Sequence, residues 1–101
     1  MHSKDVVIRR LVAQFGTDAE KALLVADENS SVRCVLAVHG SETVQKALLD
    51  DTKQKVRIAL ARHGSENIRT KLLKDDSRAV RLTAQRKRRW SIASALTLIF
   101  S

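Results

Sequence analysis

The stretch from Asp51 to Gly64 reads DTKQKVRIALARHG, and related versions of it stand at equal distances on either side. Twenty-four residues earlier the chain reads DENSSVRCVLAVHG (Asp27 to Gly40), and twenty-four residues later it reads DDSRAVRLTAQRKR (Asp75 to Arg88). Self-similarity at a fixed period of this length is typical of repeat architectures. We therefore expect the chain to be built from copies of one small structural unit.

Several positions keep the same residue type in every copy. A hydrophobic residue followed by arginine recurs as Ile8-Arg9, Val32-Arg33, Val56-Arg57 and Val80-Arg81. The other matching positions are Gly16, Gly40 and Gly64; Thr17, Ser41 and Ser65; Asp18, Glu42 and Glu66; Leu24, Leu48 and Leu72; and Asp27, Asp51 and Asp75. This alignment divides a single domain, residues 1–101, into a half repeat 1–15, repeats 16–39, 40–63 and 64–87, and a C-terminal cap helix 88–101.

Each repeat is expected to contain two short helices. The glycine is expected to end one helix in a left-handed conformation, and the following Thr or Ser to cap the next helix. In the first repeat, Thr17 to Glu20 has the capping-box pattern. The first helix of each repeat is predicted over residues 17–26, 41–49 and 65–74, and the second over residues 30–39, 53–63 and 77–87.

The second helix of each repeat has one apolar face. Its spacing of i, i+3, i+4 and i+7 is seen in Val56, Ala59, Leu60 and His63. Because so short a helix cannot bury this face alone, neighbouring repeats must stack on one another. The expected fold is all-α, a right-handed α-solenoid of about four such two-helix repeats.

The segment LDDTKQKVRIALARHGS, from Leu49 to Ser65, resembles the leucine-rich repeat variant, a short relative of HEAT repeats. The resemblance extends from about Val7 to Lys87. The chain lacks the prolines that shape the second helix of the variant, so we expect ordinary α-helices, closer to HEAT, rather than alternating α and 3₁₀ segments. The best-known setting of the variant includes a cysteine cluster for an iron–sulfur centre, and this chain has no such cluster. The resemblance implies a fold and no activity.

The resemblance also gives the Asp and Arg of each repeat a structural interpretation. In HEAT-like repeats such residues commonly form a ladder between adjacent units, and here the matching pairs are Asp27/Arg33, Asp51/Arg57 and Asp75/Arg81. Arginine suits this role because its planar guanidinium can bond a carboxylate and a helix-end carbonyl together. The alternative is a row of ligand-binding arginines, and we expect the ladder.

The sequence predicts no catalytic, cofactor or metal site. His39 and His63 share one repeat position without an acidic residue or cysteine at metal-ligand spacing, so we expect packing or capping at a helix end. Cys34 takes the position of Ile58 and Leu82 and is expected to be a small core residue rather than a catalytic partner of His39. No nucleophile elbow, phosphate-binding glycine loop or zinc motif is present. An enzyme is therefore not expected.

Composition favours a soluble cytoplasmic protein. The single cysteine cannot form an intramolecular disulfide, and the lack of such disulfides is usual in proteins inside cells. The first apolar residues are interrupted by Arg9 and Arg10, unlike a secretory signal. The apolar run at 91–100 is about half as long as a membrane span. No membrane association is expected.

The formal net charge of +8 is concentrated toward the C-terminal end, where residues 64–101 carry nine basic and three acidic side chains. Such a patch attracts polyanions, including nucleic acids. The candidate polyanion-binding residues are Arg62, Arg78, Arg86, Lys87, Arg88 and Arg89. The alternatives are a solvated basic terminus that aids solubility and a nuclear targeting signal.

An uncharged segment follows the basic run. Ile92 and Leu96 fall at core positions of the repeat, which leaves Trp90, Leu98 and Ile99 for contact with another chain. A homodimer through this segment is one interpretation, and truncation of a longer repeat protein is the other.

These observations favour a non-enzymatic helical-repeat binding module. The leading hypothesis is a protein–protein interaction scaffold, because stacked short repeats present an extended surface. The alternative is nucleic-acid binding through the basic C-terminal half. The scarcity of aromatic side chains, which would stack on bases, argues against the alternative.

Overall fold

The part of the chain that the structure describes is entirely helical apart from its turns. The computed structural model describes residues 5–86. Its labelled helices are α1 (Val6–Phe15), α2 (Asp18–Leu23), α3 (Ser30–His39), α4 (Glu42–Ala47), α5 (Gln54–His63) and α6 (Glu66–Leu72). A further helical segment covers residues 78–86, and no strand occurs within residues 5–86. The predicted all-α class is confirmed.

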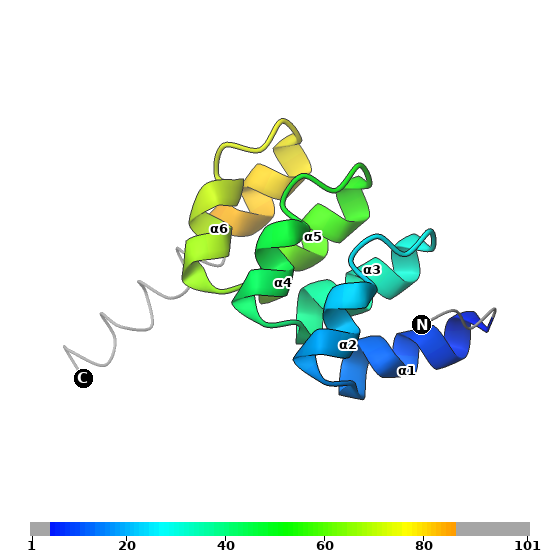
Figure 1. Cartoon of the computed structure of the whole chain (residues 1–101). Coiled ribbons are helices and arrows are strands. Elements are labelled where there is room, and N and C mark those ends of the chain that lie inside the picture. The colour runs from blue at the N-terminus through cyan, green and yellow to red at the C-terminus, as the bar shows by residue number, and fades with distance from the viewer. Residues whose placement is uncertain (1–4, 87–101) are drawn as a thin grey trace, which may run out of the picture.

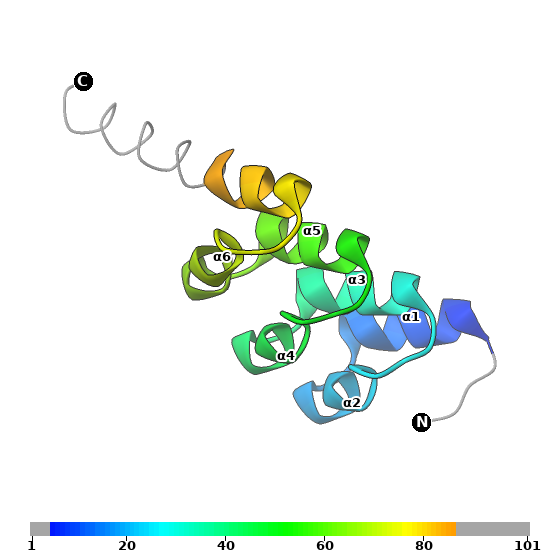
Figure 2. The same cartoon turned by 90° about the horizontal axis from the view of Figure 1, so that it is seen from above.

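The helices lie in two rows (Figures 1 and 2). We call α1, α3, α5 and the segment 78–86 the long-helix row; the segment 78–86 lies beside α5 in both views. The helices α2, α4 and α6 form the short-helix row. Each short helix also contacts the long helix that precedes it in the chain. Helices related by the 24-residue period are therefore neighbours within the same row.

The short helices begin at the predicted capping residues. The Thr17 hydroxyl accepts a hydrogen bond from the Glu20 N–H at 3.2 Å, and the Thr17 N–H donates to the Glu20 carboxylate at 2.8 Å. Both halves of the capping box are thus present, as predicted. Ser41 and Ser65 each accept a hydrogen bond from the N–H three residues further on.

The conformation predicted for the glycines is wrong. No glycine has a positive φ; Gly40 lies at φ −74° and ψ 157°, in extended backbone. Glycine is needed here for space: a Cβ on Gly40 would lie 2.6 Å from the Leu36 carbonyl oxygen and 2.7 Å from Cγ1 of Val44. The short helix therefore packs directly against the end of the long helix.

The short helices end earlier than the sequence predicted. They stop at Leu23, Ala47 and Leu72 rather than at residues 26, 49 and 74. The next residues form tight turns, in which the N–H of Leu24 donates to the Lys21 carbonyl at 3.0 Å. The tightened turn places Leu24 in the core, where it is almost fully buried.

The core lies between the two rows. Its buried hydrophobic residues are Ala13, Leu24, Val32, Leu36, Ala37, Val44, Leu48, Val56, Leu60, Ala61, Ile68, Leu72, Val80 and Ala84. On α5 the buried side chains are Val56, Leu60 and Ala61. The predicted apolar face is therefore wrong at its end, because His63 is exposed and Ala61 takes its place.

Candidate functional site

Three ion pairs join neighbouring repeats. Nε of Arg33 lies 2.7 Å from Oδ2 of Asp51, and both side chains are largely buried. The same contact is made by Arg9 with Asp27 at 2.7 Å and by Arg57 with Asp75 at 2.9 Å. Each arginine therefore pairs with the aspartate that lies 18 residues further along the chain. The arginine Arg9, in the half repeat, belongs to this set.

The aspartate six residues before each arginine contributes its main-chain oxygen instead. Nη1 of Arg33 donates to the Asp27 carbonyl at 2.5 Å, and Nη1 of Arg57 donates to the Asp51 carbonyl at 2.6 Å. The proposed pairs Asp27/Arg33 and Asp51/Arg57 thus exist as hydrogen bonds, while the carboxylate partner lies in the next repeat. One guanidinium binds both groups, as its planar shape allows.

The last arginine of the set differs from the others. Arg81 donates to the main-chain oxygens of Asp75 at 2.7 Å and Asp76 at 2.9 Å. The residue 18 positions beyond it is Ile99, which has no carboxylate. Within residues 5–86 the repeated ion pair therefore ends at Arg57.

The ladder arginines are used for structure. The hydrogen bond to Asp51 raises the pKa of Arg33, which holds its positive charge firmly in a largely buried position. The Asp51 carboxylate also accepts a hydrogen bond from the Lys53 N–H at 2.9 Å, at the start of α5. Each link of the ladder therefore connects one long helix to the residues just before the next.

A second set of repeated polar contacts was missed by the sequence analysis. Lys21, Gln45 and Arg69 share one repeat position, and each donates to a main-chain oxygen at the end of a long helix. The acceptors are the carbonyls of His39, Ala37 and Gly64, respectively, at 2.9, 3.0 and 2.9 Å. The residue type changes in every repeat, so the column does not stand out by identity. Its signal is a polar residue on the inner face of each short helix.

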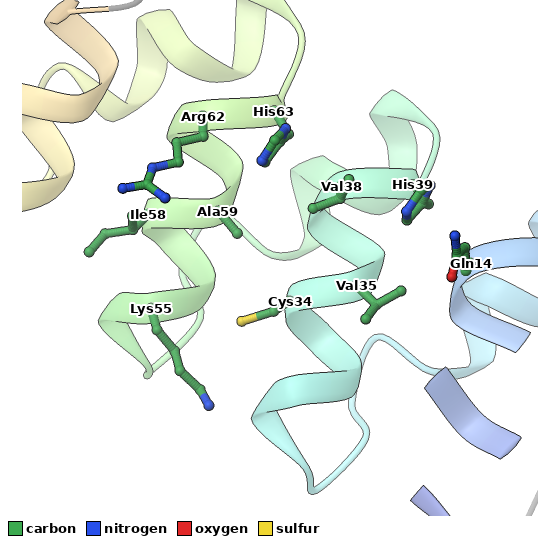
Figure 3. Close-up of a pocket in the computed structure, with 10 residues that line it drawn as sticks. All are labelled: Gln14, Cys34, Val35, Val38, His39, Lys55, Ile58, Ala59, Arg62 and His63. Atoms are coloured by element: carbon green, nitrogen blue, oxygen red, sulfur yellow. The ribbon is translucent and has the colours of Figure 1, made fainter. Parts of the chain in front are cut away.

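A groove of about 430 Å³ crosses the outer side of the long-helix row and is lined by residues of α1, α3 and α5 (Figure 3). Its aliphatic and thiol lining consists of Cys34, Val35, Val38, Ile58 and Ala59. Its polar lining consists of Gln14, His39, Lys55, Arg62 and His63. We call this cavity the groove. It combines an apolar floor with basic side chains.

Figure 3 shows how the groove is assembled from neighbouring repeats. Cys34 and Val38 project from α3 toward α5, and Ala59 projects from α5 toward α3. Arg62 points away from α3, on the far side of α5. Side chains from α3 and α5 therefore meet between the two helices and form the apolar floor of the groove.

Cys34 packs against the core but is less buried than predicted. Cys34 is only partly buried, its counterpart Ile58 is also partly buried, and Leu82 is 45% exposed. This repeat position faces the outer side of the row, where an aliphatic side chain does not indicate burial. Burial is still sufficient to raise the pKa of the Cys34 thiol, an effect that the nearby Lys55 charge opposes.

The two histidines lie at the ends of α3 and α5, as expected, and both are exposed. They lie on different helices and line the same groove. Within residues 5–86 no group of three or more His, Cys, Asp or Glu side chains could hold a metal ion.

The predicted basic residues are only partly within the described chain. Arg62, Arg78 and Arg86 are exposed on the long-helix row. Lys87, Arg88 and Arg89 lie outside the described residues, as do the candidates for self-association, Trp90, Leu98 and Ile99.

No acidic residue lies on the long helices. The helices read VVIRRLVAQF, SSVRCVLAVH and QKVRIALARH, and residues 78–86 read RAVRLTAQR. The carboxylates of Asp27, Asp51 and Asp75 lie before these helices and are bonded to the ladder arginines. The charged side chains that the long helices themselves carry are therefore all basic.

Comparison with known proteins yields no relative: no family model, curated protein or solved structure matches this chain. No described helix is long and apolar enough to cross a membrane.

Proposed function

We propose that this chain is a non-enzymatic helical-repeat module, a right-handed α-solenoid of short repeats that binds another protein. The observation that carries the proposal is the groove on the outer side of the long-helix row. Cavities of this size with an apolar lining and a few polar groups are typical binding sites. The ladder and the core leave this side of the row uncovered within residues 5–86.

A comparison between the repeats supports this assignment. A core position of the long helices keeps its residue type, as Val32, Val56 and Val80 are all fully buried. Two of the positions that line the groove change between repeats: Val38 corresponds to Arg62 and Cys34 to Ile58. Variation on one face over a constant framework is how repeat proteins present a ligand-specific surface.

Nucleic-acid binding is the second candidate. It is favoured by the absence of acidic residues on the long helices and by the exposed Arg62, Arg78 and Arg86. Phosphate contacts require little beyond such a positive surface. The groove lining contains two histidines but no Phe, Tyr or Trp, the larger rings on which bases commonly stack, so protein binding remains the first proposal.

Retention on immobilised duplex DNA and on heparin, compared across a salt gradient, tests these alternatives. We expect weak binding that is lost near physiological salt and shows no sequence preference, because it arises from net charge alone. Replacing Arg86, Lys87, Arg88 and Arg89 with Gln should reduce the salt dependence by up to about 0.9 per lost phosphate contact. Tight binding to one DNA sequence at physiological salt would overturn the proposal in favour of nucleic-acid recognition.

A further inference from the structure

The groove has a chemical character that restricts what it can bind. Cys34, Val38 and Ala59 form an apolar floor between α3 and α5. Lys55 lies at one end of this floor, in the first turn of α5, and His63 lies at the other end, in the last turn. An occupant must therefore offer apolar groups in the middle and tolerate an ammonium group at one end and an imidazole at the other.

The charges around the groove all have the same sign. None of its lining residues is acidic, and none of the helices α1, α3 and α5 carries an acidic residue. The carboxylate that acts electrostatically on Cys34 is Asp51, which is bonded to Arg33. Electrostatic complementarity therefore favours an occupant that carries negative charge.

We propose that the groove binds a linear segment of a partner protein in which apolar side chains are flanked by Asp or Glu. This inference rests on the proposed protein-binding function and adds the chemistry of the bound segment. The apolar side chains enter the floor formed by Cys34, Val38 and Ala59. The flanking carboxylates approach Lys55 and Arg62, the exposed cations of the lining, which we call the rim. Lys55 lies at one end of the floor, and Arg62 is reached from the far side of α5.

Such a segment fits the groove better than a nucleic acid does. A phosphate backbone would satisfy the basic rim but has no aliphatic group for the floor. An uncharged apolar segment would fill the floor without using the rim. Only a segment with both properties uses every part of the surface.

A displayed library of random peptides, selected against the full-length chain, provides the probe. We expect the enriched peptides to contain apolar residues with an excess of Asp and Glu beside them. In the variant with Lys55→Glu and Arg62→Glu, their affinity should fall at least about tenfold at physiological salt. The control with Lys46→Glu and Lys71→Glu makes the same charge change at exposed positions of α4 and α6 and should stay within about twofold of the original affinity.

Cys34 supplies a second measurement that needs no variant. It is the only cysteine in the chain and lines the groove. Saturating peptide should slow its alkylation by N-ethylmaleimide at least about fivefold, because a seated peptide covers the thiol. This measurement decides the matter if the charge-reversed variant fails to fold.

Each remaining outcome contradicts the inference in a distinguishable way. Peptides that protect Cys34 but show no acidic excess, or that bind both variants equally, overturn the acidic preference and leave protein binding at the groove intact. Duplex DNA that protects Cys34 where no peptide does overturns both the inference and the proposed function. A selection that enriches no peptide, with Cys34 unprotected by DNA, overturns the inference alone.

Discussion

Arginine is required in the ladder because each guanidinium bonds two differently placed groups. Arg33 donates through Nε and Nη2 to the Asp51 carboxylate and through Nη1 to the Asp27 carbonyl. Lysine carries a single ammonium group and cannot reproduce this fork. The residue thus links its own repeat to the next one.

Removing this arginine should destabilise the fold more than removing the last one of the series. Arg33→Ala leaves the buried Asp51 carboxylate without its partner and should cost about 3 kcal/mol of unfolding free energy. Arg81→Ala removes only bonds to main-chain oxygens and should cost about 1 kcal/mol. Urea unfolding followed by circular dichroism measures both. Equal losses for the two variants would show that the carboxylate contact contributes nothing.

The thiol of Cys34 should react slowly at neutral pH. Burial raises its pKa, so less reactive thiolate is present than for an exposed cysteine, and the alkylation rate should keep rising at higher pH. Lys55→Ala removes a charge that lowers this pKa and should slow the reaction further, whereas Lys46→Ala should not. Rates of iodoacetamide reaction between neutral and alkaline pH measure this. A rate that levels off as early as that of a free thiol would contradict it.

The roles of residues were predictable at positions where every repeat has the same residue type. Which aspartate pairs with which arginine was not predictable. The residue six positions before an arginine and the residue eighteen positions after it are equivalent residues of adjacent repeats, because the two separations add up to the 24-residue period. Alignment therefore cannot tell whether Arg33 pairs with Asp27 or with Asp51, and only the stacking of the helices decides. The prediction of a left-handed conformation for the glycines was wrong because two different requirements select glycine. One is a left-handed backbone, and the other is close packing, which applies here.

At the scale of the elements, the short helices depend on contacts outside themselves. Six residues, as in α2 and α4, are too few for a helix that is stable alone. Each is held by its N-terminal cap and by the polar side chain that reaches the end of a long helix. In α4 this side chain is Gln45, which donates to the Ala37 carbonyl and accepts from the Ser65 N–H.

Loss of Gln45 should therefore loosen the short-helix row. Gln45→Ala leaves the Ala37 carbonyl and the Ser65 N–H without this partner and should cost about 2 kcal/mol. Gln14→Ala is the matched control, because Gln14 is exposed on α1 and its loss should cost less than about 0.5 kcal/mol. Thermal melts compare the two. Equal melting temperatures for both variants would remove Gln45 from the set of stabilising contacts.

The elements themselves were largely predictable, because turn chemistry and apolar spacing recur in each repeat. The Thr17 cap and the extent of α3, residues 30–39, agree with the prediction. The ends of the short helices were not predictable. A tight turn and a further helical turn would both direct an apolar residue such as Leu24 toward the core. The extent of burial on the outer face was also not predictable, because Cys34 and Ile58 are apolar yet line the groove.

At the scale of the whole molecule, the sequence leaves self-association as a prediction. The chain contains an uncharged apolar run at residues 91–100, which a second copy could cover. Light scattering of the intact chain is expected to show a dimer, and a variant ending at Arg89 is expected to be monomeric or unstable. Well-behaved monomers in both cases would remove the dimer.

The groove across the long-helix row is the surface that we assign to a partner protein, and Cys34 lines it. A photoreactive cross-linker attached to Cys34, in a lysate of the source cells, reports which molecules reach the groove. The control carries Cys34→Ser and Lys46→Cys, which moves the cross-linker to an exposed position on α4, in the short-helix row. We predict a defined protein cross-linked from position 34 and absent from position 46. Identical products from both positions, or cross-links to nucleic acid alone, would contradict the assignment.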